Sequence, residues 1–127
     1  MNDILASDAA QLAEDLREPG NSYISPELFA SRMHISVQNL AQLACVDRTT
    51  LLRSPDNEKA QTYMRKAISV IGMTMEVNGG DAERAIYWYR NIPLVELGGL
   101  TAEQYVDQGE IGGILDYVQN LSAGATG

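Results

Sequence analysis

Apolar residues recur along most of this chain at intervals of three and four, which is the spacing of an amphipathic helix. A short N-terminal stripe consists of Leu5, Ala9, Leu12 and Leu16. A longer stripe predicts a helix over about 57–77, and it consists of Ala60, Tyr63, Met64, Ala67, Ile68, Ile71 and Met75. No segment keeps the strict apolar–polar alternation of a half-buried strand. The pattern therefore predicts an all-α fold.

Residues that favour helix caps mark where the other predicted helices begin. Three short helices follow the N-terminal one, at about 26–33, 37–44 and 48–54, with expected caps at Ser25, Ser36 and Asp47. Asp81 is expected to cap a helix that ends near Asn91 and buries Ala82, Ala85, Ile86 and Tyr89. Thr101 and Gln104 have the spacing of a capping box for a helix to about Gln108, and a last helix is expected over about 110–121.

The stretch LAQLACVDRTTLLR, residues 40–53, has the spacing of a helix–turn–helix. Ala41 is the small residue expected at the helix crossing, Cys45 occupies the turn position where glycine is usual, and Val46 and Leu51 are expected apolar anchors. The polar side chains left on the outside are candidates for contacts with DNA bases and phosphates: Gln38, Arg48, Thr49, Thr50 and Arg53. The same spacing also suits ordinary packed helices and helix pairs that serve dimerisation or protein docking.

The formal net charge of -8 conflicts at first with a DNA-binding motif. The acidic residues are unevenly distributed, however. Residues 1–24 hold five acids and one Arg, and residues 67–127 hold eight acids and two Arg. Residues 25–66 hold six basic residues and four acids, so the only net-positive segment contains the candidate motif. Because salt screens charges beyond about 10 Å, the local charge matters more than the total.

The sequence offers little for catalysis or for a cofactor. One histidine and one cysteine do not supply a zinc site of the usual kind, and the glycine pairs do not form a nucleotide-binding loop. We expect His34 in an exposed cap or loop, and Cys45 as a buried structural thiol. The single cysteine fits a reducing cytoplasm, and no stretch predicts a signal peptide or a membrane span. The chain is therefore expected to be a cytoplasmic protein that is not an enzyme and needs no cofactor.

The segment DAERAIYWYRNIPLVELGGLTAEQYVDQGEIGGILDYVQNLSAG, residues 81–124, resembles the toxin-binding domain of the Xre/MbcA/ParS antitoxin family. The resemblance lies in the order of an Ala-rich helix with Trp88, an Arg-Asn-x-Pro turn, a Leu-Gly-Gly loop, a helix that starts at Thr101, and Gly109 before a last helix. The predicted helix–turn–helix precedes this segment in the chain, which is the order of the two parts in the family. The sequence departs from the pattern at Ala102, where many relatives carry Pro, and at Gly112-Gly113.

This resemblance implies a type II antitoxin whose partner is a RES-domain toxin that consumes NAD or transfers ADP-ribose. The C-terminal domain would bind the toxin and block its NAD cleft, while the helix–turn–helix would bind promoter DNA and repress the operon, as a homodimer on paired half-sites. The resemblance covers about residues 25–127 and implies an Xre-like helix–turn–helix (25–56), a linking helix (57–80) and a toxin-binding domain (81–127). An acidic N-terminal helix (1–20) is expected before them and is not part of the family's pattern. The implied toxin-binding residues are Trp88, Arg90, Leu97, Gly98, Gly99, Thr101, Gly124 and Gly127.

Two other readings stay open on the sequence alone. One is a stand-alone DNA-binding regulator whose acidic half serves dimerisation. The other is an adaptor whose helix–turn–helix does not bind DNA. Trp88 is likewise open to two interpretations, because a lone tryptophan is either an interface anchor or a core residue beneath the loop.

Overall fold

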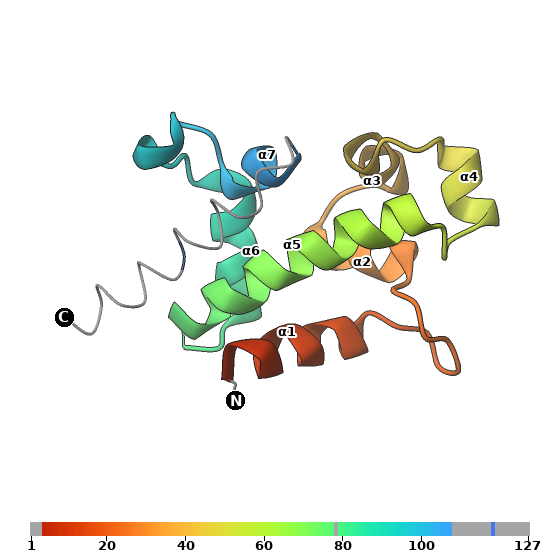
Figure 1. The fold of residues 1–127 in the computed structure, drawn as a ribbon, viewed down its shortest axis with the longest axis horizontal. Coiled ribbons are helices and arrows are strands. Elements are labelled where there is room, and N and C mark those ends of the chain that lie inside the picture. Colours follow the sequence, from red (N-terminus) through yellow and green to blue (C-terminus); the bar gives the residue numbers. More distant parts are fainter. Residues whose placement is uncertain (1–3, 78, 108–117, 119–127) are drawn as a thin grey trace. The chain divides into compact units, whose positions relative to one another are not determined.

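The computed structural model describes residues 4–77, 79–107 and 118 (Figure 1). Every regular element in this part of the chain is helical, which confirms the all-α prediction. The elements are α1 (Ile4–Asp15), α2 (Pro26–Met33), α3 (Val37–Ala44), α4 (Arg48–Arg53), α5 (Glu58–Val77), α6 (Ala82–Asn91), the 3-10 turn η1 (Val95–Leu97) and α7 (Ala102–Asp107). The predicted last helix over 110–121 lies outside the described residues except for Val118, which is buried.

Most of the helices begin at the positions that their capping residues predict. Three caps are confirmed, since each side-chain oxygen accepts a hydrogen bond from the backbone N–H three residues on: Ser25, Ser36 and Asp81. Asp47 occupies the cap position of α4, but its side chain makes no capping hydrogen bond. For α5 the capping oxygen belongs to Asn57, whose Oδ1 accepts from the Ala60 N–H at 2.9 Å.

The chain forms two compact units. The central unit is Leu12–Arg65, and the terminal unit combines Met1–Gln11 with Lys66–Gly127. Helices α1 and α5 each continue from one unit into the other. The boundary between the two units therefore falls inside α5, the long helix that was expected to form a separate linking part over 57–80.

The core of the central unit lies among α2, α3, α4 and the first half of α5. Helix α3 contacts both α2 and α4, and the Phe29 and Tyr63 rings meet edge to face with their centroids 6.4 Å apart. The buried apolar side chains are Leu12, Leu16, Ile24, Phe29, Ala30, Met33, Leu40, Ala41, Ala44, Leu51, Ala60, Tyr63 and Met64. The predicted stripe on this half of α5 is therefore confirmed as core.

One buried polar side chain joins three segments of the central unit. The Ile24 N–H donates to Gln61 Oε1 at 3.0 Å, and Gln61 Nε2 donates to the carbonyl oxygens of Ile24 at 2.8 Å and Pro55 at 2.9 Å. Gln61 is only 3% exposed, so these bonds are shielded from water. They tie the start of α5 to the segment before α2 and to the linker after α4.

In the terminal unit, α1 and α5 approach closely. A Cβ atom built on Gly72 would lie 2.6 Å from the Cβ of Ala9 and 2.7 Å from its Cα, so any side chain there collides with α1 backbone. Helices α6 and α7 also contact each other. The predicted α6 positions Ala85, Ile86 and Tyr89 are buried, whereas Ala82 is half-buried. No helix in the described residues is long and apolar enough to cross a membrane.

Candidate functional site

The first candidate site is the pair α3 and α4 with the turn of Cys45, Val46 and Asp47 between them. The turn closes through two backbone bonds, from the Cys45 N–H to the Gln42 carbonyl at 3.2 Å and from the Val46 N–H to the Ala41 carbonyl at 3.0 Å. These are the two bonds of a Schellman motif, which requires a left-handed residue after the helix. Cys45 supplies that residue, with φ at +60°, and this explains why its position usually holds glycine.

The prediction of a buried thiol at Cys45 is wrong, because this side chain is exposed. The backbone bonds close the turn, and the helix crossing is filled by other residues, since Ala41 is 1% exposed and Leu51 is 0% exposed. Val46, the second predicted anchor, is half-buried. His34 ends α2 in the same way with φ at +62° and is exposed, as predicted.

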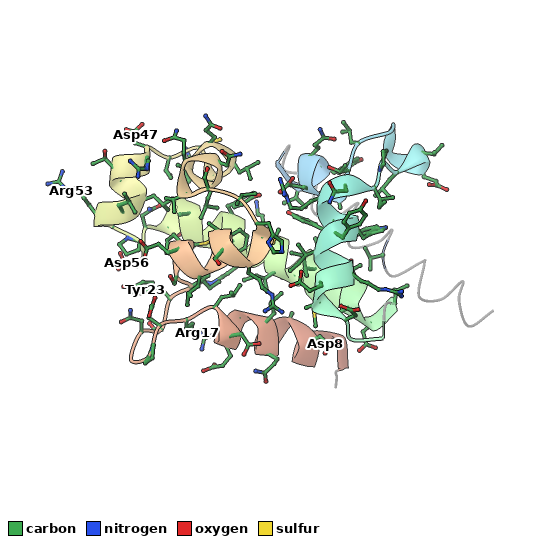
Figure 2. All side chains as sticks on the ribbon, turned by 180° about the vertical axis from the view of Figure 1, so that it is seen from behind. Asp8, Arg17, Tyr23, Asp47, Arg53 and Asp56 are labelled. Carbon is green, nitrogen blue, oxygen red and sulfur yellow. The ribbon has the colours of Figure 1, made fainter. Side chains whose placement is uncertain are left out.

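The five side chains predicted to face DNA are all exposed. They are Gln38 on α3 and Arg48, Thr49, Thr50 and Arg53 on α4. Figure 2 shows Arg53 extending away from α4. Leu51 anchors α4 in the core. The exposed side chains of this short helix are four polar ones, two of them with guanidinium groups, and Leu52, which is 45% exposed. Asp47 adds one exposed carboxylate at the start of α4.

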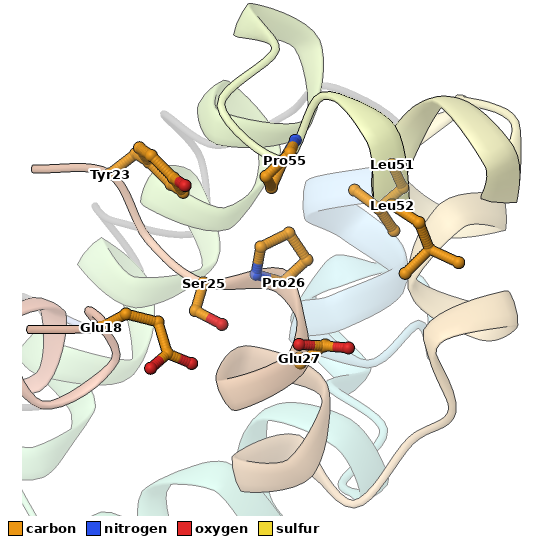
Figure 3. Close-up of a pocket in the computed structure, with 8 residues that line it drawn as sticks. All are labelled: Glu18, Tyr23, Ser25, Pro26, Glu27, Leu51, Leu52 and Pro55. Atoms are coloured by element: carbon orange, nitrogen blue, oxygen red, sulfur yellow. The ribbon is translucent and has the colours of Figure 1, made fainter. Parts of the chain in front are cut away.

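A cavity of about 140 Å³ in the central unit lies beside α4 (Figure 3). Its lining consists of Glu18, Tyr23, Ser25, Pro26, Glu27, Leu51, Leu52 and Pro55. The only charged side chains among these are the two glutamates, so the cavity disfavours a phosphate or another anion. The cavity is therefore chemically distinct from the basic surface of α4.

The second candidate site is the helix–loop–helix of α6, η1 and α7 in the terminal unit. Arg90 Nε and Glu103 Oε2 form an ion pair at 3.1 Å between α6 and α7, with side chains 29% and 11% exposed. A partly buried pair of this kind fixes the spacing of the two helices, since leaving either charge unpaired is costly. Arg90 was predicted to bind a partner, and the structure engages it inside the unit; the acidic partner Glu103 was not anticipated.

The loop between α6 and α7 is closed at its base. The Leu94 N–H donates to the Leu100 carbonyl at 2.9 Å, and the Gly99 N–H donates to the Leu94 carbonyl at 2.8 Å. Gly98 and Gly99 have φ of +77° and +84°, with open space where a Cβ would be. Glycine is therefore needed here for backbone conformation, because other residues are strained at positive φ.

The capping box at the start of α7 is confirmed. The Thr101 N–H donates to Gln104 Oε1 at 3.0 Å, and the Gln104 N–H donates to Thr101 Oγ1 at 3.2 Å. The Thr101 hydroxyl is thus used within the loop. Trp88 is half-buried, and the fully buried aromatic residue of α6 is its neighbour Tyr89.

Three of the predicted toxin-binding positions lie partly or wholly outside the described residues. Leu97 lies in η1, and its backbone alone is described. Gly124 and Gly127 lie outside the described residues altogether. The structure thus brings together Arg90, Gly98, Gly99 and Thr101 in one helix–loop–helix.

One carboxyl group in the terminal unit has a perturbed acidity. Desolvation by burial raises the pKa of Glu76 above its usual value, and the hydrogen bond and negative charge of Asp8 raise it further. Asp8 lies on α1 and Glu76 on α5, and no metal-binding cluster accompanies them among the described residues. Throughout that part of the chain, no three His, Cys, Asp or Glu side chains are grouped so as to hold a metal ion.

Comparison of the chain with protein-family models, with curated proteins and with solved structures finds no match.

Proposed function

We propose that this protein is the antitoxin of a type II toxin–antitoxin system, which binds and inhibits a RES-domain NAD-consuming toxin and represses its own promoter. The observation that carries the DNA-binding half is the group of exposed polar and basic side chains on α4, which is accompanied by one exposed apolar side chain, Leu52. Arg48, Thr49, Thr50 and Arg53 are exposed there, whereas Leu51 between them is fully buried. A second helix held by one apolar anchor, with such side chains outward, suits insertion into a major groove.

The residue types on this surface suit DNA. Arginine pairs with guanine edges or with phosphates, and threonine contacts phosphates or thymine methyl groups. Gln38 at the start of α3 suits a contact with the sugar–phosphate backbone of the DNA. A homodimer that reads two half-sites is part of this proposal, because one short helix reaches few base pairs.

The toxin-binding half of the proposal rests on the resemblance of residues 81–124 to the toxin-binding domain of the Xre/MbcA/ParS family. Two physical features support it. The loop that holds Gly98 and Gly99 is closed by backbone hydrogen bonds, so little entropy is lost when a partner binds it. Residues 67–127 carry eight acids and two arginines, a charge that complements the cationic groups an NAD cleft needs for a pyrophosphate.

Promoter binding by the full-length protein tests the DNA half. We expect Arg48→Ala and Arg53→Ala each to weaken binding to the DNA upstream of the gene. Removing an arginine that binds a phosphate should also lower the slope of affinity against salt concentration by about 0.9. Arg65→Ala is the matched control, because Arg65 is exposed in the same unit but lies on α5. If all three variants lose affinity equally, or none does, α4 is not the DNA-reading helix.

Co-expression tests the toxin half. A RES-domain protein encoded beside the gene should co-purify with this chain, and the chain should relieve the loss of cellular NAD that the toxin causes. The Arg48→Ala, Arg53→Ala double variant should relieve it equally well, because inhibition does not use α4. If the two proteins do not co-purify and NAD is still consumed, the antitoxin assignment fails. Retained promoter binding would then leave a stand-alone DNA-binding regulator.

A further inference from the structure

The terminal unit exposes large apolar side chains within a short segment of α6 and the loop that follows. Tyr87 is 62% exposed, Ile92 38% and Val95 87%. Apart from these three, the large apolar side chains exposed in the described residues are Leu52 and Val77, at 45% and 40%. The segment 87–95 therefore holds the most exposed apolar side chains that the structure describes. Of the aromatic residues of α6, the family resemblance implied Trp88 as toxin-binding, and not Tyr87.

Val95 is held outward by a rigid turn. It begins η1, directly after Leu94, which is 3% exposed and anchors the loop in the core. The Gly98 N–H donates to the Val95 carbonyl at 3.1 Å, and the bonds between Leu94 and both Gly99 and Leu100 close the loop below it. An apolar side chain on so constrained a backbone loses little conformational entropy when a partner covers it.

Tyr87 is carried by an equally constrained helix. Asn91 Nδ2 donates to the Tyr87 carbonyl at 3.1 Å, and α6 is joined to α7 by the ion pair of Arg90 with Glu103. Tyr87 as a whole residue is nevertheless mostly exposed. Tyrosine is among the residues most often found at the energetic centre of protein interfaces, because it buries a large area at a small entropic cost.

The segment that carries these two side chains is mainly negative in charge. From Asp81 to Asp107 the chain carries five acidic and two basic residues; Arg90 is paired with Glu103, and Arg84 lies 4.0 Å from Asp81, so the segment keeps a net charge of three negative units. Asp81, Glu83 and Glu96 are all exposed. A partner that covers Tyr87 and Val95 is therefore complementary if its apolar recess is bordered by basic side chains.

We propose that Tyr87 and Val95 are the apolar anchors of the toxin-binding surface, and that they dock into an apolar recess of the toxin bordered by basic residues. This inference rests on the proposed function, because the partner is the RES-domain toxin. It assigns the contacts to residues outside the set implied by the resemblance. Within that set, Arg90, Gly98, Gly99 and Thr101 shape the loop that presents Val95.

The test measures the dissociation constant between the full-length protein and the toxin carrying an inactivating substitution. We expect Tyr87→Ala and Val95→Ala each to weaken binding by about tenfold or more, since burial of such a side chain contributes enough for that change. Val95→Asp should weaken it further. Leu52→Ala is the matched control, because it shortens an exposed apolar side chain of the central unit, and it should change affinity by less than about twofold.

The outcomes of this experiment are distinct. Circular dichroism should show unchanged helix content in all four variants, because the altered side chains are exposed. If the wild-type chain binds the toxin and the Tyr87 and Val95 variants bind it equally well, the anchors are wrong and the antitoxin assignment stands. If the wild-type chain does not bind the toxin, the proposed function fails and this inference fails with it. Equal losses of affinity in Leu52→Ala and Val95→Ala would also overturn the inference.

Discussion

Gln61 offers the sharpest test of what holds the central unit together. Its side chain is 3% exposed and makes three hydrogen bonds, one from the Ile24 N–H and two to the carbonyls of Ile24 and Pro55. Gln61→Met keeps the size and shape of the side chain but removes all three bonds. At about 1 kcal/mol for each net hydrogen bond, we expect the free energy of unfolding to fall by about 3 kcal/mol. That is a large part of the total stability of about 5–15 kcal/mol typical of a small protein.

Gln61→Glu separates hydrogen bonding from charge. The carboxylate still accepts from the Ile24 N–H, but it faces two carbonyl oxygens to which it has nothing to donate. At neutral pH this buried, uncompensated charge should cost about 3–5 kcal/mol. Burial raises the pKa of such a carboxyl in the folded state, so the cost should shrink as the pH falls and the group is protonated. The Gln61→Met deficit should not depend on pH in this way.

Urea unfolding followed by circular dichroism at the helix band measures both effects, and hydrogen exchange of the Ile24 amide reports on its missing bond directly. Gln42→Met is the matched control, because Gln42 is exposed on α3, and it should change stability by less than about 0.5 kcal/mol. A Gln61→Met cost below about 1 kcal/mol, with unchanged exchange at Ile24, would refute the reasoning. A Gln61→Glu deficit that stays constant with pH would refute its electrostatic part.

Two further predictions concern the terminal unit. Gly72→Ala should destabilise the protein by about 1 kcal/mol or more in urea unfolding, because overpacking against Ala9 outweighs the gain of about 1 kcal/mol in helix propensity. A second substitution, Ala9→Gly, should restore the lost stability only in part, since the Ala9 Cα lies 2.7 Å from the added Cβ. A Gly72→Ala variant that is more stable than the wild type would contradict the close packing of the two helices. Glu76→Gln should be more stable than wild type at neutral pH, because the raised pKa of Glu76 means that the folded state favours the protonated carboxyl. The difference between this variant and the wild type should vanish in thermal melts as the pH falls below the ordinary value of 4.5, and a difference that persists there would exclude the Asp8 pair as its cause.

The helices were predictable because their starts depend on residues close together in the chain. Ser25, Ser36 and Asp81 each satisfy a backbone N–H three residues away, so a local pattern is enough to find them. The same is true of the Thr101–Gln104 capping box. The cap of α5 was harder to place because Ser54, Asp56 and Asn57 all favour caps, and only the structure shows that Asn57 makes the bond.

The pairings that determine tertiary structure were not predictable from one sequence. Gln61 reaches Ile24 across 37 positions, and Arg90 reaches Glu103 across 13. Nothing in the local pattern distinguishes Gln61 or Glu103 from exposed polar residues, because burial depends on how the helices pack. At Cys45 the local pattern correctly located a turn position that favours glycine. The exposure of the Cys45 thiol was not predicted, because it depends on how the turn is closed and not on the spacing of the apolar residues.

Residues that support the loop between α6 and α7 have to be distinguished from residues that are only exposed on it when variants of the candidate toxin-binding site are interpreted. Arg90 and Thr101 hold the loop through an ion pair and a capping bond, so weaker partner binding by their variants is explained by a loosened loop as well as by removal of a direct contact. The Val95 side chain is exposed, and only its backbone takes part in the hydrogen bonds of the turn. Val95→Ala therefore removes exposed apolar area without removing an interaction that holds the loop. Only substitutions of the second kind identify a contact. Alanine variants of Arg90 and Thr101 alone would therefore measure the integrity of the loop, whereas Tyr87→Ala and Val95→Ala test the proposed contact.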